Sequence, residues 1–266
     1  MQIDHINMDF LGLLATEAGK AVLKIYDTDF SVDYKDDQSP LTLADTRSHQ
    51  IICKGLTARY PDIPILSEEG KGTPYHERKD WNQFWLVDPL DGTKEFIRKN
   101  GEFTINIALI ENNQPVLGVI YVPVLDILFL GNVKRNCIRD FRGVKTTLKM
   151  VKWTPQARIR VVRSRSHPSP DMEDLLGRLP SYAAISRGSS LKFCAVAAGE
   201  ADFYPRLGPT SEWDTAAGHA IILAAGGVVV DMMGNPLRYN KESLLNPAFM
   251  VAPDIDFLKQ IGVLTV

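Results

Sequence analysis

The sequence predicts a mixed α/β fold whose two halves are organised differently. The first half, residues 1–152, combines amphipathic helical patterns with apolar runs that indicate an antiparallel sheet, an α+β arrangement. In the second half, residues 153–266, strand and helix patterns alternate, which is typical of an α/β layer. With 266 residues and an ordinary globular composition, the chain can form one large domain with a sizeable core. We therefore expect one domain with two subdomains.

Charge and cysteine content limit the partners and the compartment. The net charge is -2, so we expect no nucleic-acid partner, and any anionic substrate must meet a local positive site. The three cysteines lie far apart, without the spacing of a zinc site or a disulfide framework, which favours a reducing cytoplasm. The N-terminal region does not resemble a signal peptide, and the most apolar stretch, 216–230, is too short and interrupted to span a bilayer. The oligomeric state and peripheral attachment to the inner membrane stay open.

Two helices are predicted within the first 60 residues. Apolar residues recur at helical spacing over residues 6–26, and a second helix is expected over residues 42–60. Asp45 follows Thr42 by three residues, which is the spacing of a helix-capping pair. From the residues alone, Asp45 is equally well explained as a cap or as a functional carboxylate. Between the helices we expect a short strand over residues 32–35 and a loop over residues 36–40.

The stretch after the apolar run 84–87 carries the strongest chemical signal. The run predicts a buried strand, and it is followed at once by Asp88-Pro89-Leu90-Asp91-Gly92-Thr93. Two carboxylates within one turn repel each other, and burial increases the repulsion, so a cation between them is favoured. Carboxylate oxygens suit magnesium. A turn with two solvated aspartates is the alternative. The strand predicted over residues 63–66 delivers Glu68 and Glu69, and this second acidic segment favours the metal site.

The remaining pattern predicts further strands, helices and loops. Strands are expected over residues 103–110, 115–123, 126–131, 158–162, 182–185, 202–205 and 228–231, and helices over 171–179, 191–198 and 212–225. Residues 70–82 are predicted to form a flexible loop, either a lid or ordinary surface. The basic segment 132–143 is predicted to be a solvated hairpin rather than a nucleic-acid patch.

Two helix starts in the second half carry candidate chemistry. Gly188-Ser189-Ser190 precedes a helix with Lys192 in its first turn, so free backbone amides and a lysine could bind a phosphate there. A serine cap with an exposed lysine is the alternative. Asp214 lies in the first turn of an apolar helix, where an aspartate either compensates the helix dipole or serves as a ligand.

Three of these motifs together resemble a known family. Ser67-Glu68-Glu69, the segment 88–96 and Trp213-Asp214-Thr215-Ala216-Ala217 are similar to signatures of the inositol monophosphatase superfamily of magnesium-dependent, lithium-sensitive phosphomonoesterases. Gly188-Ser189-Ser190-Leu191-Lys192-Phe193 is similar to its 3'(2'),5'-bisphosphate nucleotidase branch. The resemblance runs through most of the chain, although segment 132–143 lacks the Gly-rich turn usual in relatives. It implies a layered αβαβα sugar-phosphatase-like sandwich, two or three Mg²⁺ ions, and a small phosphorylated nucleotide as substrate.

The resemblance also implies a role for each matching residue. Thr93, oriented by Asp45, would position the attacking water. The implied metal ligands are Glu68, Asp88, the Leu90 carbonyl, Asp91 and Asp214; the catalytic group is Asp45, Thr93 and Glu68; and the substrate contacts are Gly92, Thr93, Ser164, His167, Gly188, Ser189, Lys192, Arg206 and Asp214. Inositol monophosphate or fructose 1,6-bisphosphate is the alternative substrate. A non-catalytic nucleotide sensor is disfavoured, because no metal ligand is missing.

Overall fold

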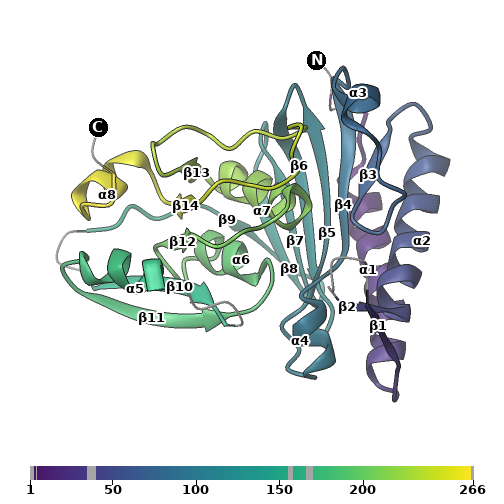
Figure 1. Ribbon diagram of the computed structural model, residues 1–266, viewed down its shortest axis with the longest axis horizontal. Helices are drawn as coiled ribbons and strands as arrows, with labels where there is room; N and C mark the ends of the chain where they lie inside the picture. Colours follow the sequence, from purple (N-terminus) through teal and green to yellow (C-terminus); the bar gives the residue numbers. More distant parts are fainter. Residues whose placement is uncertain (1–2, 4, 35–39, 155–157, 166–169, 265–266) are drawn as a thin grey trace.

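Helices and β-sheets stack in layers (Figure 1). The computed structural model describes the chain except for residues 1–2, 4, 35–39, 155–157, 166–169 and 265–266. Its helices are α1 (Met8–Tyr26), α2 (Leu43–Arg59), α3 (Tyr75–Arg78), α4 (Thr93–Ile97), α5 (Pro170–Gly177), α6 (Leu191–Ala197), α7 (Glu212–Ala225) and α8 (Ile255–Gln260). Its strands are β1 (Val32–Tyr34), β2 (Pro40–Thr42), β3 (Ile65–Ser67), β4 (Gln83–Asp91), β5 (Thr104–Glu111), β6 (Gln114–Val122), β7 (Ile127–Asn132), β8 (Cys137–Phe141), β9 (Val144–Leu148), β10 (Ile159–Ser164), β11 (Tyr182–Arg187), β12 (Tyr204–Arg206), β13 (Val228–Asp231) and β14 (Phe249–Ala252).

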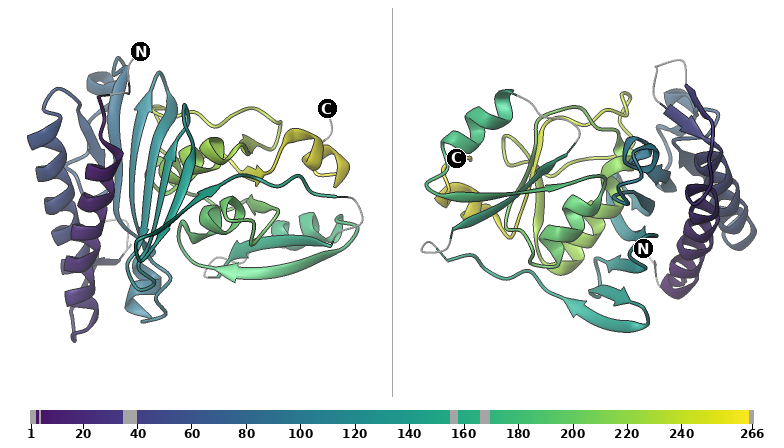
Figure 2. Two further views of the ribbon diagram at one scale, coloured as in Figure 1. Left: turned by 180° about the vertical axis from the view of Figure 1, so that it is seen from behind. Right: turned by 90° about the horizontal axis from the view of Figure 1, so that it is seen from below.

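A seven-stranded sheet in the order β3-β4-β5-β6-β7-β8-β9 is the main layer of the first half. Its neighbouring strands are antiparallel except β3 and β4, which are parallel. Helices α1 and α2 cover one face, and α7 packs on the other (Figure 2). Beyond α6 and α7 lie the strands β10 to β14, with α5 and α8 on their far side. The order helix, sheet, helix, sheet, helix confirms the predicted layered αβαβα sandwich.

Strand β4 is buried on both faces, and this explains its continuous apolar run over residues 84–87. Trp85 and Val87 pack in the core shared with α1 and α2, whereas Phe84 and Leu86 pack in the core shared with α6 and α7. Successive side chains of a strand point to opposite faces, so a strand covered on both sides is apolar throughout. The continuous run 84–87 therefore fixes β4 between two helical layers.

Several segments differ from the pattern-based expectation. Residues 88–91 do not leave the sheet but continue β4, with a bulge between Asp88 and Asp91 where the pairing with β5 shifts. Segment 70–82 contains α3, and Arg78 at its end is only 2% exposed, so it is anchored rather than a free loop. The hairpin expected over 132–143 is present, but it adds β8 and β9 to the sheet. In the second half, β10 and β11 pair in parallel, whereas β12, β14 and β13 pair antiparallel.

Within the described parts of the chain, every helix is too short or too polar to cross a lipid bilayer. The predicted loop 36–40 falls almost entirely on residues outside that description. Cys53, Cys137 and Cys194 are free thiols.

Candidate active site

Three carboxylates from separate segments of the chain meet beside the carboxyl end of β3. Glu68 follows β3, Asp88 lies in β4, and Asp214 lies in the first turn of α7. Because β3 and β4 are parallel, their carboxyl ends lie at the same edge of the sheet, and α7 packs across that sheet. One oxygen from each of the three carboxylates lies within 4.8 Å of the other two. A group of oxygen ligands this close fits a hard divalent cation.

The electrostatics of the three carboxylates also favour a cation. Asp88 is 1% exposed, and burial raises its pKa well above the ordinary value, with the charges of Glu68, Asp91 and Asp214 adding to the effect. Burial, followed by the charges of Asp91 and Glu68, raises the pKa of Asp214 to about 8. Neighbouring negative charges in a buried site oppose ionisation, and a bound divalent cation reverses that preference. The site is therefore matched to a metal ion rather than to water.

Asp91 links this edge of the sheet to the start of α6. Its Oδ2 accepts hydrogen bonds from the Ser190 backbone N–H (2.6 Å), the Ser190 hydroxyl (2.7 Å) and the Ser189 hydroxyl (2.8 Å). Asn106, on β5, donates through Nδ2 to Ser190 Oγ at 2.9 Å. These bonds fix the orientation of the Asp91 carboxylate beside the group of three. Sequence reasoning named Ser190 only as part of the motif before the helix, and it missed Asn106. A polar residue inside the apolar run 103–110 was the available signal for Asn106.

Asp45 makes the hydrogen bonds that each of the two interpretations left open by the sequence requires. Its Oδ2 accepts from the Thr42 N–H (2.8 Å) and hydroxyl (2.6 Å), which completes the cap of α2. Its Oδ1 accepts from the Thr93 hydroxyl at 3.1 Å. The same hydroxyl lies 3.3 Å from the carbonyl oxygen of Leu90, and since it has one hydrogen it donates to one acceptor at a time. The capping bonds hold the carboxylate aimed at Thr93.

A cleft of about 270 Å³ opens beside the carboxylates. It brings together most of the residues that the sequence singled out, from both halves of the chain. The predicted site residues that line it are Glu68, Asp91, Gly92, Thr93, Ser164, Ser189, Lys192, Arg206 and Asp214. The lining residues to which sequence reasoning assigned no role of their own are Lys94, Glu95, Ser190, Phe193, Tyr204, Thr210 and Thr215.

Lys192 and Arg206 place two buried cations in this cleft. Lys192 is 6% exposed, so it is not the exposed lysine of the alternative interpretation. Its Nζ donates to the Ser189 carbonyl at 2.5 Å and lies 5.6 Å from the centre of the Tyr204 ring. Burial lowers its pKa to about 8. Arg206 donates through Nη2 to the Pro209 carbonyl, while its Nε is buried with no hydrogen-bond partner in the described residues. Buried cations with an unsatisfied donor are costly unless an anion binds beside them.

The backbone amides of Gly188 and Ser190, before α6, do not point at a free phosphate site as the sequence predicted. The Gly188 N–H donates to Glu102 Oε2 at 2.7 Å, and the Ser190 N–H donates to Asp91. These amides therefore hold carboxylates in place instead of pointing at a free anion site. Gly188 does not appear in the cleft lining, and a Cβ there would lie 2.7 Å from Cγ of Glu95, so only glycine fits. His167 lies outside the described residues.

Comparison with known proteins agrees with this geometry. The model of the inositol monophosphatase family matches residues 8–256. The chain belongs to the inositol monophosphatase family. The family is metal-dependent, which agrees with the group formed by Glu68, Asp88 and Asp214. The resemblance inferred from the sequence motifs is thereby confirmed.

Individual relatives cover nearly the whole chain. The chain is 48% identical over 241 residues to the 3'(2'),5'-bisphosphate nucleotidase CysQ of Salmonella typhimurium, covering 90% of this chain and 96% of that protein. It is 45% identical over 248 residues to CysQ of Escherichia coli, covering 92% and 99%. The crystal structure of CysQ from Bacteroides thetaiotaomicron is 42% identical with a TM-score of 0.78, covering 93% and 97%. An IMPase of Thermotoga maritima, at 22% identity and a TM-score of 0.79 with coverage of 96% and 95%, shares the fold.

Proposed function

We propose that this protein is a 3'(2'),5'-bisphosphate nucleotidase that removes the 3'-phosphate of adenosine 3',5'-bisphosphate. The observation that carries the proposal is that one cleft is lined both by Glu68 and Asp214 of the carboxylate group and by the buried cations Lys192 and Arg206. A substrate with two phosphates can place one at each of these positions. The relatives named CysQ, at 45–48% identity, support the same substrate class.

We propose Mg²⁺ as the metal, with two or three ions per site. Glu68, Asp88 and the Leu90 carbonyl would hold one ion, and Asp88, Asp91 and Asp214 a second. Bound magnesium would lower the pKa of a coordinated water and neutralise charge on the phosphoryl oxygens. The fit rests on the oxygen donors, their separation within 4.8 Å and the raised pKa of Asp88 and Asp214.

The chain's own residues supply positioning. The Thr93 hydroxyl donates to Asp45, so its oxygen lone pairs are directed away from that carboxylate and can accept a hydrogen bond from the attacking water. Phosphoryl transfer needs little covalent work from the protein, because positioning and charge stabilisation carry most of the catalysis. Lys192 and Arg206 would hold the 5'-phosphate through charge-assisted hydrogen bonds. Gly92, Ser164, Ser189 and His167 remain proposed substrate contacts.

A phosphate-release screen tests the substrate assignment. Purified protein with Mg²⁺ is offered adenosine 3',5'-bisphosphate, its 5'-sulfated form, inositol 1-phosphate and fructose 1,6-bisphosphate. We expect the highest kcat/KM with the adenosine nucleotides. A higher kcat/KM for inositol 1-phosphate or fructose 1,6-bisphosphate would contradict the proposal and assign a sugar phosphatase. The screen also decides between the bisphosphate and its sulfated form.

Variants of the second anion position sharpen the test. Arg206→Ala should lower kcat/KM for the 3',5'-bisphosphate about 10-fold or more, the loss expected for one charge-assisted hydrogen bond. Hydrolysis of a small monophosphate should change much less. The exposed Arg59, on α2, provides the matched control Arg59→Ala, which should leave both activities unchanged. An equal loss on both substrates would place Arg206 at the cleaved phosphate.

A cytoplasmic location and the division into subdomains near residue 152 are also retained as proposals. The three free thiols support the first. Peripheral attachment to the inner membrane finds no support in the described residues. The change of pattern near Trp153 supports the second.

A further inference from the structure

The segment 206–214 presents three residues to the cleft, and residues 210–212 within it are hydrogen-bonded to one loop. Arg206, Thr210 and Asp214 all line the cleft. The loop is formed by residues 238–246, which run between β13 and β14; we call it the clamp loop. It pairs with the segment through a bridge between Ser211 and Leu245. The position of the cleft residues thus depends on a loop that does not itself line the cleft.

Asn246 makes the most direct connection. Its backbone N–H donates to the Thr210 carbonyl at 2.8 Å, and its Nδ2 donates to the Ser211 carbonyl at 2.7 Å. Nδ2 also lies 3.2 Å from Thr210 Oγ1 and 3.1 Å from Thr215 Oγ1. The Ser211 N–H in turn donates to Asp214 Oδ2 at 2.8 Å. One amide side chain therefore fixes the turn that orients the Asp214 carboxylate.

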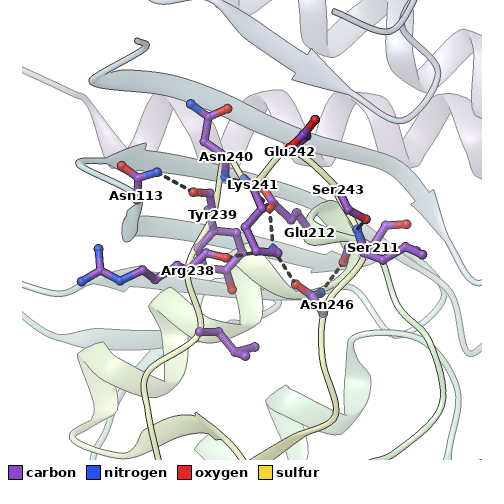
Figure 3. Close-up of polar contacts among 12 residues, drawn as sticks. Asn113, Ser211, Glu212, Arg238, Tyr239, Asn240, Lys241, Glu242, Ser243 and Asn246 are labelled. Carbon is purple, nitrogen blue, oxygen red and sulfur yellow. Dashed lines mark hydrogen bonds and ion pairs between the residues drawn. The ribbon is translucent and has the colours of Figure 1, made fainter. Parts of the chain in front are cut away.

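Glu212 forms the second connection from inside the protein. Its side chain is fully buried, and it accepts from the Asn240 N–H (2.7 Å), the Lys241 N–H (3.0 Å) and Lys241 Nζ (2.5 Å). Its own N–H donates to the Leu244 carbonyl at 2.8 Å. Figure 3 shows Glu212, Lys241 and Asn246 converging between α7 and the clamp loop. The Glu212 carboxylate is fully buried, whereas the Lys241 side chain is 30% exposed. The ammonium and the backbone donors hold a defined geometry because any shift would leave the buried carboxylate uncompensated.

Arg78 bonds residues 240–242 of the clamp loop to the stretch of chain that runs between Glu68 and Asp88. Arg78 lies on α3 in that stretch. Its Nη1 donates to Asn240 Oδ1 (2.9 Å) and to the Lys241 carbonyl (2.8 Å), and its Nη2 donates to the Glu242 carbonyl (3.0 Å). Asn240 Nδ2 donates back to the Arg78 carbonyl at 2.7 Å. The clamp loop is therefore bonded to both segments that supply the carboxylate group.

We propose that the clamp loop sets the position of Asp214 relative to Glu68 and Asp88, and that Asn246 and Arg78 are positioning residues for metal binding. The proposal rests on the metal-dependent function proposed above. Metal–ligand distances tolerate only a few tenths of an ångström, so a small displacement of Asp214 weakens binding. Groups that orient metal ligands typically change metal affinity 10- to 100-fold when they are lost.

The test measures metal binding directly on substrate-free protein. Asn246→Asp keeps the shape of the side chain but removes the Nδ2 donors that hold Ser211. We expect about 10-fold weaker Mg²⁺ binding by calorimetry, and the same for Mn²⁺ followed by electron paramagnetic resonance. Asn235→Asp is the matched control, because Asn235 is an exposed asparagine whose Nδ2 bonds Asp231 outside the cleft. The control should bind both ions as the wild type does.

A second variant tests the other end of the clamp loop and keeps the proposal testable if Asn246→Asp does not fold. Arg78→Lys retains the charge but cannot form the forked set of bonds. It should weaken metal binding at least 3-fold, with circular dichroism unchanged. A lower melting temperature with unchanged metal affinity in both variants would show a purely structural role and overturn the proposal. Because no substrate is used, failure of the nucleotide assignment in the phosphate-release screen would leave this result unaffected.

Discussion

Lys192→Met should make the metal-free protein more stable while impairing use of bisphosphate nucleotides. The lysine is buried beside Arg206, and burial lowers its pKa from 10.5 to about 8. Keeping the ammonium charged in the folded protein therefore costs free energy of folding. Methionine has a similar length and no charge. The substitution therefore removes the cost of the buried ammonium and retains most of the packing against Tyr204.

The magnitude follows from the pKa shift. Lowering the pKa from 10.5 to about 8 corresponds to a penalty of about 3 kcal/mol at pH 7. Loss of the hydrogen bond from Nζ to the Ser189 carbonyl offsets about 1 kcal/mol, which leaves a net stabilisation of about 2 kcal/mol. The folded pKa lies below the unfolded one, so the unfolded chain holds more protons between pH 8 and 10.5. The free energy of unfolding of the wild type therefore rises with pH across that window. At pH 10 the penalty from the buried lysine is below about 1 kcal/mol.

Urea unfolding in excess EDTA, at pH 7 and at pH 10, measures the effect. EDTA is required because a bound cation would change the charge of Asp91 and Asp214, which face the lysine. We expect the variant to be about 2 kcal/mol more stable at pH 7 and nearly equal to wild type at pH 10. A variant that is less stable at pH 7, or a difference that is the same at both pH values, would refute the assignment of a strained buried cation.

Two further predictions concern the carboxylates and the Thr93 pair. In EDTA, the raised pKa values of Asp88 and Asp214 mean that the folded state holds more protons than the unfolded state between about pH 4 and pH 8. The urea midpoint should therefore fall as pH rises from 5 to 8, and excess Mg²⁺ should remove the fall; a midpoint that rises in EDTA would contradict this. Thr93→Val should lower kcat about 100-fold without changing metal affinity, since it removes one positioned hydrogen-bonding group. Thr16→Val, on α1, is the control, and wild-type kcat in Thr93→Val would exclude the proposed role.

The sequence by itself determined the features that depend on neighbouring residues. The apolar run before Asp88, the capping pair Thr42 and Asp45, and the helix that begins at Glu212 and ends before Gly226 are all present as predicted. Each is decided by local periodicity or by backbone hydrogen bonds between residues a few positions apart. The resemblance of three motifs to the family then predicted that Glu68, Asp88 and Asp214 belong to one site.

Only the tertiary structure decided which polar groups are buried together. Lys192 looked equally suited to the surface, Ser190 was named only as part of a motif, and Arg78 and Asn246 carried no distinguishing pattern. Their partners lie up to 164 residues away in the chain, as in the bond from Arg78 to the Glu242 carbonyl. A polar side chain acquires a role through the desolvation and hydrogen bonding that packing imposes on it. Desolvation and hydrogen bonding depend on which residues lie close in space after the layers pack together, and the spacing of residues along the sequence does not reveal that.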